Sequence, residues 1–370
     1  MKSYLSGRQQ STVVNGAISD TLPVLSGVPQ GSIIGPTLFV LFINDIYSGL
    51  SQGTNILLYA DDTKIWREIS IEEDHDILQQ DINYLMAWAR TNKMNFHPDK
   101  CKVLPILKRW SPFDGILPFA RYIYSMGQNL LEYTDSEKDL GIIMTSNLNF
   151  NSHVDSLYGK ANQKFGMLKR NCHFVNDLSK RRVLYLTLVR SIFEHCPIIW
   201  RPSSSTTVAK IEGMQKRALK WIRNDYGVSY SVEEIYHVHC KQLNILPLRY
   251  RFDYHDLKFF HSLVHQYNSC TKLPSYLTLF SGSSRLRSSH LDRLSIISSI
   301  PPGKAISKSY FYRTHLIWNR LPLSLRDTAR PGAFKVELLK HIWKEFVCTS
   351  VSVDSSSDSD FDTSQSPDPD

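Results

Sequence analysis

The residues with the clearest chemical potential are two adjacent aspartates, Asp61 and Asp62, which lie between two short apolar runs. Residues 55–59 and 63–66 have the length of strands, so the pattern predicts a β-hairpin with both carboxylates at its tip. Carboxylates that close repel each other unless a cation offsets their charge. Mg²⁺ or Mn²⁺ suits this role, because both prefer carboxylate oxygens and Mg²⁺ keeps positions open for phosphate ligands. The alternative is an ordinary turn, in which Asp-Asp is common.

A segment rich in turn-forming residues lies upstream: Ser26-Gly27-Val28-Pro29-Gln30-Gly31-Ser32. It is followed by an apolar run, 36–46, that predicts a helix. Pro36 fits the first turn of that helix, where its missing N–H would have no partner in any case. A loop of this kind directly before a helix is a second candidate for a functional segment.

The elements that must position these residues follow from apolar periodicity. Helical spacing predicts a helix over 74–90 and another in which Val154, Leu157, Ala161, Phe165 and Leu168 share one face. Further helices are expected over 179–196, with Ser179 as the N-cap, and over 208–222, 248–264 and 333–346. Extended pieces are expected at 11–14, 20–25 and 94–104, a hairpin around 126–128, and a loop or linker over 281–299. The fold class is therefore α+β, with a small mixed part followed by a mainly helical part.

Two of these segments together resemble a known family. The chain resembles the palm of LINE-type (non-LTR) reverse transcriptases. Residues 26–39, followed by Ile43-Asn44-Asp45-Ile46, are similar to the family's B motif. Tyr59-Ala60-Asp61-Asp62-Thr63 is similar to its C motif. Residues 88–101 look like the D motif, 139–153 like the E motif, and 313–326 like the far C-terminal segment of such proteins. The resemblance covers roughly residues 3–345.

The resemblance implies a partial polymerase palm, with a β-hairpin and a small antiparallel sheet packed by helices. It also implies a mainly helical thumb and C-terminal region, and specific roles for individual residues. Asp61 and Asp62 would be the catalytic, metal-binding pair. The loop under the templating base pair would contain Gly27, Pro29, Gln30 and Gly31, where glycine lets the backbone approach a nucleotide closely. Lys100 would contact the triphosphate, or else is a solvated surface lysine. The phosphates of the primer–template duplex would be contacted by Lys160, Lys164, Lys169, Arg170, Arg181 and Arg182, although a solvated helix face is the alternative for each.

The same resemblance implies partners and a domain plan. The partners are an RNA template, a DNA primer and deoxynucleoside triphosphates, and no protein partner is evident. We expect a truncated palm at 1–150, a thumb-like region at 151–280, a C-terminal helical segment at 281–348 and a disordered acidic tail at 349–370. Only 26 residues precede Gly27, and the one acidic residue among them, Asp20, does not match the family's A motif. We therefore expect negligible polymerase activity from this chain alone. The alternative is a non-enzymatic nucleic-acid-binding remnant of a retroelement.

Charge and composition agree with a polyanionic partner without proving one. The net charge is +8 even though six aspartates lie within residues 354–370, so the rest of the chain is more basic. No apolar stretch has the length of a membrane span and no secretory leader is evident, so we expect an intracellular protein, nuclear by its resemblance. The six cysteines form no Cys-x-x-Cys pair, and His237-Val238-His239-Cys240 is interpreted as packing rather than as metal ligands.

Overall fold

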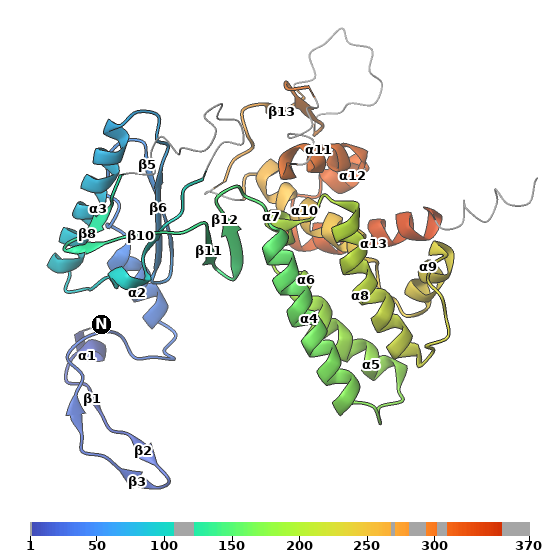
Figure 1. The fold of residues 1–370 in the computed structure, drawn as a ribbon, viewed down its shortest axis with the longest axis horizontal. Helices are drawn as coiled ribbons and strands as arrows, with labels where there is room; N and C mark the ends of the chain where they lie inside the picture. The colour runs from blue at the N-terminus through green and yellow to red at the C-terminus, as the bar shows by residue number, and fades with distance from the viewer. Residues whose placement is uncertain (1, 107–121, 268–270, 281–293, 302–308, 350–370) are drawn as a thin grey trace, which may run out of the picture. The chain divides into compact units, whose positions relative to one another are not determined.

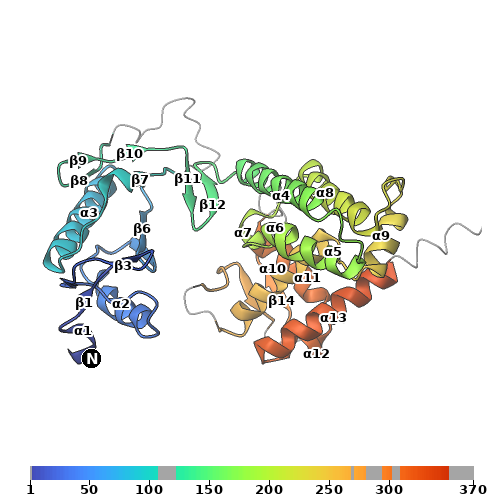
Figure 2. The same cartoon turned by 90° about the horizontal axis from the view of Figure 1, so that it is seen from below.

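The computed structural model describes residues 2–106, 122–267, 271–280, 294–301 and 309–349 (Figures 1 and 2). The chain divides into two compact units. The first comprises residues 1–138 and 145–148, and the second comprises residues 139–144 and the chain from 149 onward. The first unit mixes short strands with helices, and the second is mainly helical, so the α+β assignment is confirmed.

The first unit begins with small elements and then forms a longer hairpin. Its helices are α1 (Lys2–Leu5), α2 (Gly35–Ile43), α3 (Glu73–Thr91) and the 3₁₀ turn η1 (Pro98–Lys100). Its antiparallel pairs are β1 (Gln9–Gln10) with β4 (Leu22–Pro23), β2 (Val13–Val14) with β3 (Ala17–Ile18), β5 (Thr54–Tyr59) with β6 (Asp62–Arg67), and β8 (Ser125–Met126) with β9 (Asn129–Leu130). β7 (Lys102–Val103) pairs in parallel with β10 (Glu132–Tyr133), and β11 (Ser136–Asp139) pairs with β12 (Ile142–Thr145).

The β5–β6 hairpin is held by one apolar face. Its strands alternate strictly between partly buried and exposed side chains. Ile56, Leu58 and Ile65 pack with Leu85 and Trp88 of α3, which lies along the hairpin in Figure 1. Because side chains alternate across a strand, the residues between them face the opposite side of the hairpin. The helix thus fixes the hairpin from one side only.

The second unit is built from helices around a single core. They are α4 (Asn151–Asn171), α5 (Leu178–Tyr185), α6 (Ser191–Phe193), α7 (Pro197–Trp200), α8 (Ser205–Arg223), α9 (Glu233–Gln242), α10 (Leu248–Val264), α11 (Tyr310–Arg320), α12 (Leu323–Arg326) and α13 (Pro331–Thr349). β13 (Leu277–Leu279) pairs antiparallel with β14 (Ile296–Ser298). Trp200, Trp221 and Trp318, from three of these helices, are fully buried in the same cluster.

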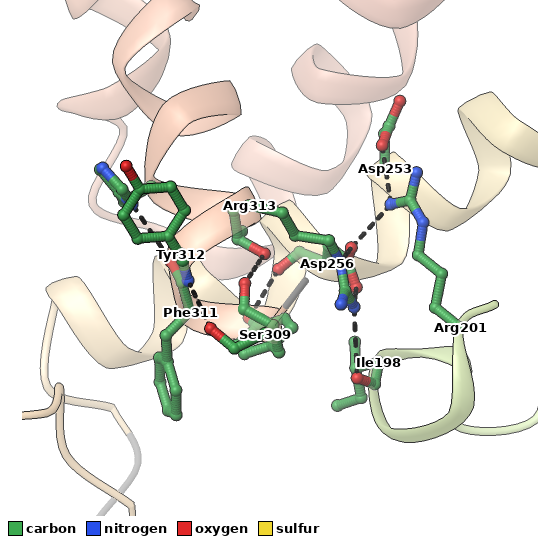
Figure 3. A network of polar contacts seen from close by, with 11 residues as sticks. Ile198, Arg201, Asp253, Asp256, Ser309, Phe311, Tyr312 and Arg313 are labelled. Carbon is green, nitrogen blue, oxygen red and sulfur yellow. Dashed lines mark hydrogen bonds and ion pairs between the residues drawn. The ribbon is translucent and has the colours of Figure 1, made fainter. Parts of the chain in front are cut away.

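A buried ion network ties three of these helices together (Figure 3). Asp256 of α10 is fully buried and accepts from Arg201 at 2.7 Å and from Arg313 of α11 at 3.0 Å. Arg201, directly after α7, also pairs with Asp253 at 2.7 Å. A buried carboxylate with two guanidinium partners keeps its charge compensated, so the network fixes how α7, α10 and α11 meet.

Several expectations about elements need correction. The helix expected over 179–196 begins at Leu178, and its N-cap is Asp177, whose side chain accepts from the Lys180 N–H, rather than Ser179. It widens into a π-helical segment, η2 (Leu186–Arg190), and ends with α6 at Phe193. The helix expected over 36–46 ends at Ile43.

Other segments differ in extent or pairing. The region expected to be extended at 94–104 contains the η1 turn, because Pro98 begins a short helix, and its strand has only two residues. The loop expected over 281–299 contains β14, and 281–293 lie outside the described residues, as does the tail from 350. The hairpin expected around residues 126–128 is present as β8–β9. The expected antiparallel palm sheet is instead a set of separate two-stranded pairs, one of them parallel.

Candidate functional site

The tip of the β5–β6 hairpin places the two aspartates as expected. Tyr59 and Asp62 pair across the hairpin, which leaves Ala60 and Asp61 as a two-residue turn. Ala60 has a φ of +52°, a left-handed conformation that a two-residue hairpin turn demands and that glycine or asparagine usually supplies. Both aspartates are exposed. The turn therefore presents two carboxylates to solvent from a rigid support.

The outer face of the hairpin carries exposed apolar side chains near these carboxylates, interspersed with Asn55 and Lys64. Because opposite residues of a strand pair share a face, Asp62 lies beside Tyr59, which is 67% exposed. Leu57 and Trp66 are exposed on the same face. Neither outer edge of the hairpin pairs with another strand in the part of the chain that the structure describes. The carboxylates thus stand next to an uncovered apolar surface.

The carboxylate pair fits a magnesium ion in its chemistry. Mg²⁺ is commonly held by one or two carboxylates, with waters and substrate phosphates filling the other positions. Among the described residues, no group of three His, Cys, Asp or Glu side chains could enclose a metal ion. Asp61 and Asp62 therefore fit one open side of a metal shell and do not form a closed cage.

The loop with Gly27, Pro29, Gln30 and Gly31 is shaped by its backbone. Gly27 and Gly31 have φ values of +75° and +77°, with open space where a Cβ would stand, so conformation rather than crowding requires glycine. The Arg8 guanidinium donates to the Gly27 carbonyl at 2.7 Å. Ser32 Oγ donates to the Pro29 carbonyl at 2.8 Å and accepts from the Gly35 N–H that begins α2. The loop is thereby held at both ends, and the exposed Gln30 lies at its centre.

Arg8 is a residue that the sequence reasoning did not identify. Its guanidinium donates to carbonyls 18 and 19 residues away, at Ser26 and Gly27. An isolated arginine in a polar arm carries no local pattern, so only the folded chain reveals this clamp.

Lys100 ends the η1 turn and is exposed. Its backbone N–H donates to the His97 carbonyl, and Cys101 Sγ lies 3.4 Å from the same oxygen. The turn fixes the backbone position of Lys100, and among the described residues no hydrogen bond or ion pair holds its long side chain. A role for Lys100 at a triphosphate stays a prediction.

The four basic residues expected to contact nucleic acid on α4 are all exposed, but they do not form one patch. Lys160 and Lys164 are about one turn apart and share a side. Lys169, about two and a half turns from Lys160, lies on roughly the opposite side of the helix. Arg170 lies on the side away from the buried residues. They are therefore distributed around the exposed circumference of α4.

Arg181 and Arg182 hold the fold together, contrary to a role at phosphates. Arg181 is 3% exposed and donates to the carbonyl of Trp221 at 2.7 Å. Arg182 donates to the carbonyls of Leu243 and Asn244 at 2.6 and 2.8 Å. These carbonyls follow or end helices, where backbone acceptors lack helical partners, so both guanidinium groups are already engaged.

Helices α4 and α8 run side by side (Figures 1 and 2), and a cluster of cationic and aromatic side chains joins them. The sequence alone did not predict this cluster. Arg217 of α8 donates to the Tyr158 hydroxyl and to Asn162 of α4, both at 2.9 Å. Lys210 lies 4.9 Å from the same tyrosine ring and pairs with Asp155. Arg217 is exposed and has no carboxylate partner in the described ranges. The seven-residue spacing of Lys210 and Arg217 puts both on one face of the helix, two turns apart, and could have indicated this cluster from the sequence.

The segment His237-Val238-His239-Cys240 is packing, as expected. His239 accepts or donates at 2.7 Å to the buried Tyr230 hydroxyl, and His237 contacts the Phe346 ring edge-on. Burial lowers the pKa of both imidazoles and raises that of Cys240. Burial disfavours the thiolate form needed for metal binding.

Comparison with known proteins shows which family the N-terminal part of the chain resembles. Residues 1–142 match the model of the reverse transcriptase (RNA-dependent DNA polymerase) family. The chain is 29% identical over 164 residues to the RNA-directed DNA polymerase from mobile element jockey of Drosophila funebris, covering 42% of this chain and 17% of that protein. It is 26% identical over 231 residues to the probable RNA-directed DNA polymerase from transposon X-element of Drosophila melanogaster, covering 60% and 24%.

These relatives are much longer than the part that this chain matches, which spans 17% and 24% of them. No solved structure matches the chain. Among the described residues, no helix is both long and apolar enough to cross a membrane. The matched segment contains both the Gly27–Gly31 loop and the Asp61–Asp62 hairpin. Over residues 1–142 the chain is therefore similar to the reverse transcriptase family, and over a longer stretch it is similar to RNA-directed DNA polymerases of mobile elements.

Proposed function

We propose that this chain forms part of an RNA-directed DNA polymerase, in which Asp61 and Asp62 bind Mg²⁺ (or Mn²⁺) at the growing end of a DNA primer. The observation that carries the proposal is the exposed carboxylate pair on a rigid hairpin tip inside the family segment. The bound metal would stabilise charge on the attacking and leaving oxygens of phosphoryl transfer. The role of the hairpin is to hold both carboxylates in place before the nucleotide arrives.

The remaining first-unit residues support this proposal through position and charge. The Gly27–Gly31 loop offers backbone without side chains, which suits close approach to a templating base pair. Exposed Lys100 would approach the triphosphate of the incoming nucleotide. The family matches favour this interpretation over a non-enzymatic remnant. A site of action at nuclear DNA stays a prediction from the family.

For the nucleic-acid backbone we propose Arg217 together with Lys160, Lys164, Lys169 and Arg170. Arg217 is the sharpest member to test, because Tyr158 and Asn162 orient its guanidinium while no carboxylate neutralises it. Lys210 is a matched control, since Asp155 already pairs with it at 2.5 Å. In binding titrations on an RNA–DNA duplex, Arg217→Ala should reduce the slope of log affinity against log salt by about one. An equal effect of Lys210→Ala would remove Arg217 from the proposed surface.

Terbium luminescence tests the metal site without requiring activity. Tb³⁺ replaces hard divalent ions, and Tyr59, directly opposite Asp62, would sensitise its emission. We expect emission that Mg²⁺ competes away, and affinity about tenfold weaker, or about 1.4 kcal/mol, in Asp61→Asn and Asp62→Asn. Asp20→Asn, another exposed carboxylate of the first unit, is the control. Unchanged emission in both hairpin variants would refute metal binding there.

Primer extension tests the polymerase activity itself. The proposed role requires that any Mg²⁺-dependent cDNA synthesis on a primed RNA is abolished by Asp61→Asn. We expect negligible extension by the 370-residue chain alone, because two carboxylates hold two metals poorly. If the purified chain clearly extends the primer and the Asp61→Asn variant does so equally well, Asp61 is not a catalytic residue.

A further inference from the structure

The second unit contains a cavity of about 460 Å³ that the polymerase proposal does not use. Its walls come from α10, from the first turns of α13, and from the chain at Cys196–Ile198. The volume falls within the range of small-molecule sites, about 300–1,000 Å³. The lining includes Cys196, Ile198, Lys258, Phe259, Phe334 and Lys335.

The one carboxylate in the wall is already neutralised. Glu194 accepts from Arg251 at 2.8 and 2.7 Å and lies 3.0 Å from Arg190. All three side chains are less than one-fifth exposed. Burial raises the pKa of Glu194, but hydrogen bonds from His255 and Arg251 and the charge of Arg190 outweigh it and lower that pKa. Glu194 therefore stays ionised, and Arg190 and Arg251 compensate most of its charge.

Two lysines of the wall lack such a partner. Within the described ranges, no carboxylate forms an ion pair with Lys258 or Lys335, and the Lys258 ammonium lies 5.7 Å from the centre of the Tyr254 ring. Burial lowers the pKa of Lys258, and the charges of Lys335 and Arg251 lower it further, while Glu194 offsets this only in part, so the two lysine ammonium groups repel each other. Lys335 also lies near the start of the 19-residue helix α13, where the helix dipole favours an anion. A ligand with two negative charges would relieve this repulsion.

Most of the rest of the wall is apolar, apart from His255, His261 and Ser262. Ile198, Pro331, Phe259 and the fully buried Phe334 line it, with Tyr267 beside them. An inorganic anion would leave this surface uncovered, whereas a phosphate attached to a ring system would cover it.

We propose that this cavity binds the terminal phosphate monoester of a nucleotide, with the phosphate on Lys258 and Lys335 and the sugar or base against Ile198 and Phe259. The source is either a free nucleoside monophosphate or the 5′-terminal nucleotide of a strand. The site needs neither Asp61 nor Asp62, so it stands or falls separately from the metal-binding hairpin.

Cys196 provides a local probe. It is exposed and lines the cavity, while Cys348, also exposed, does not line it. With the full chain, we expect AMP to slow alkylation of Cys196 about tenfold at concentrations ten times its Kd, without changing the rate at Cys348. Adenosine and inorganic phosphate should protect much less, because each supplies only half of the ligand. Peptide mass spectrometry reads both cysteines in one sample.

Calorimetric titration with AMP tests the lysines. We expect Lys335→Ala and Lys258→Ala to raise the Kd for AMP about tenfold each, as for loss of one charge-assisted contact. Lys340→Ala is the matched control, because Lys340 is an exposed lysine of the same helix that does not line the cavity. Circular dichroism confirms folding, and the exposed Lys335 is the safer substitution if Lys258→Ala disturbs the core.

Oligonucleotides with and without a 5′-phosphate separate the two sources. If the phosphorylated strand protects Cys196 and AMP does not, the ligand is a strand end. If AMP protects Cys196 and the phosphorylated strand does not, the ligand is a free nucleotide. Protection by neither, equal protection by adenosine, or an unchanged Kd in Lys335→Ala overturns the proposal. The double variant Asp61→Asn/Asp62→Asn must give the same results, so failure here leaves the polymerase proposal intact.

Discussion

At the tip of the β5–β6 hairpin, Ala60 occupies a conformation that costs an L-residue energy. Its φ of +52° brings Cβ close to the following carbonyl oxygen, at a cost of about 1–2 kcal/mol relative to glycine. Residues held in this way often lie at functional sites. The strain sits directly beside Asp61, where it fixes the direction in which the carboxylates emerge.

Substituting Ala60→Gly should therefore stabilise the first unit by about 1 kcal/mol in urea unfolding. Ala89→Gly is the opposite control, because Ala89 is buried within α3 and glycine should destabilise that helix by about 1 kcal/mol. If Ala60→Gly lowers stability instead, the left-handed turn is not the conformation that the protein adopts in solution.

His261 is a residue whose titration should affect the stability of the second unit. It is 1% exposed, stacks on Phe334 with ring centroids 3.9 Å apart, and contacts the Thr328 carbonyl through Nε2 at 2.8 Å. Burial lowers its pKa to about 4. The unfolded chain therefore binds a proton near pH 6.5 that the folded chain binds only near pH 4.

Stability should thus be complete above pH 6.5 and fall as the pH drops from 6.5 to 4. Thermal melts of wild type and His261→Gln, which keeps a donor but does not titrate, measure the difference. We expect the gap between the two melting temperatures to change across this range and to stay constant above pH 7. A constant gap throughout would show that His261 titrates alike in both states.

At the level of elements, the sequence predicts helices well where apolar spacing is regular. The face with Val154, Leu157, Ala161, Phe165 and Leu168 is buried in α4 as expected, and α10 spans the predicted residues 248–264. The hairpin with Asp61 and Asp62 at its tip is also confirmed. In these segments local pattern and tertiary packing require the same side chains to be inside.

The segment 178–193 shows why other features were not predictable. Arg181, Tyr185, Val189 and Phe193 are all buried and are spaced four residues apart. In a straight α-helix this row would rotate by about 40° at each step, because one turn contains 3.6 residues. The π-helical η2 segment widens the turn and keeps the row facing the core. From the sequence, Arg181 would be expected to be exposed to solvent, because its distant carbonyl partner at Trp221 is known only from the fold.

The Asp256 network links three helices, and its removal should be costly. Asp256→Asn would leave Arg201 and Arg313 short of a counter-charge in a buried setting. Breaking a buried pair in this way typically costs about 3–5 kcal/mol. Glu233→Gln, which breaks the exposed ion pair with Arg249, should cost at most about 1 kcal/mol. Equal effects of the two substitutions in urea unfolding would contradict a structural role for the buried network.

At the level of the whole molecule, the two units differ in how their apolar residues are used. The second unit has one continuous cluster, which includes side chains from α4, α8, α10, α11 and α13. The first unit has two smaller clusters around α3. It also exposes Leu41 and Phe42 on α2, and Leu57, Tyr59 and Trp66 on the hairpin. Exposed apolar surface of this kind promotes association and lowers solubility.

The two units should therefore behave differently when they are separated. We expect residues 139–349 expressed alone to be soluble and to unfold in one cooperative transition, because their core, which includes Ile142, is continuous. Residues 1–148 should be poorly soluble and should bind a hydrophobic dye, since the uncovered faces of α2 and β5–β6 would remain. A matched pair of hairpin substitutions, Leu57→Thr and Trp66→Thr, should raise the solubility of 1–148 without disturbing the inner face of Ile56, Leu58 and Ile65. A sharp, dye-free melt of unsubstituted 1–148 would mean that its exposed apolar faces are compatible with an independently stable unit.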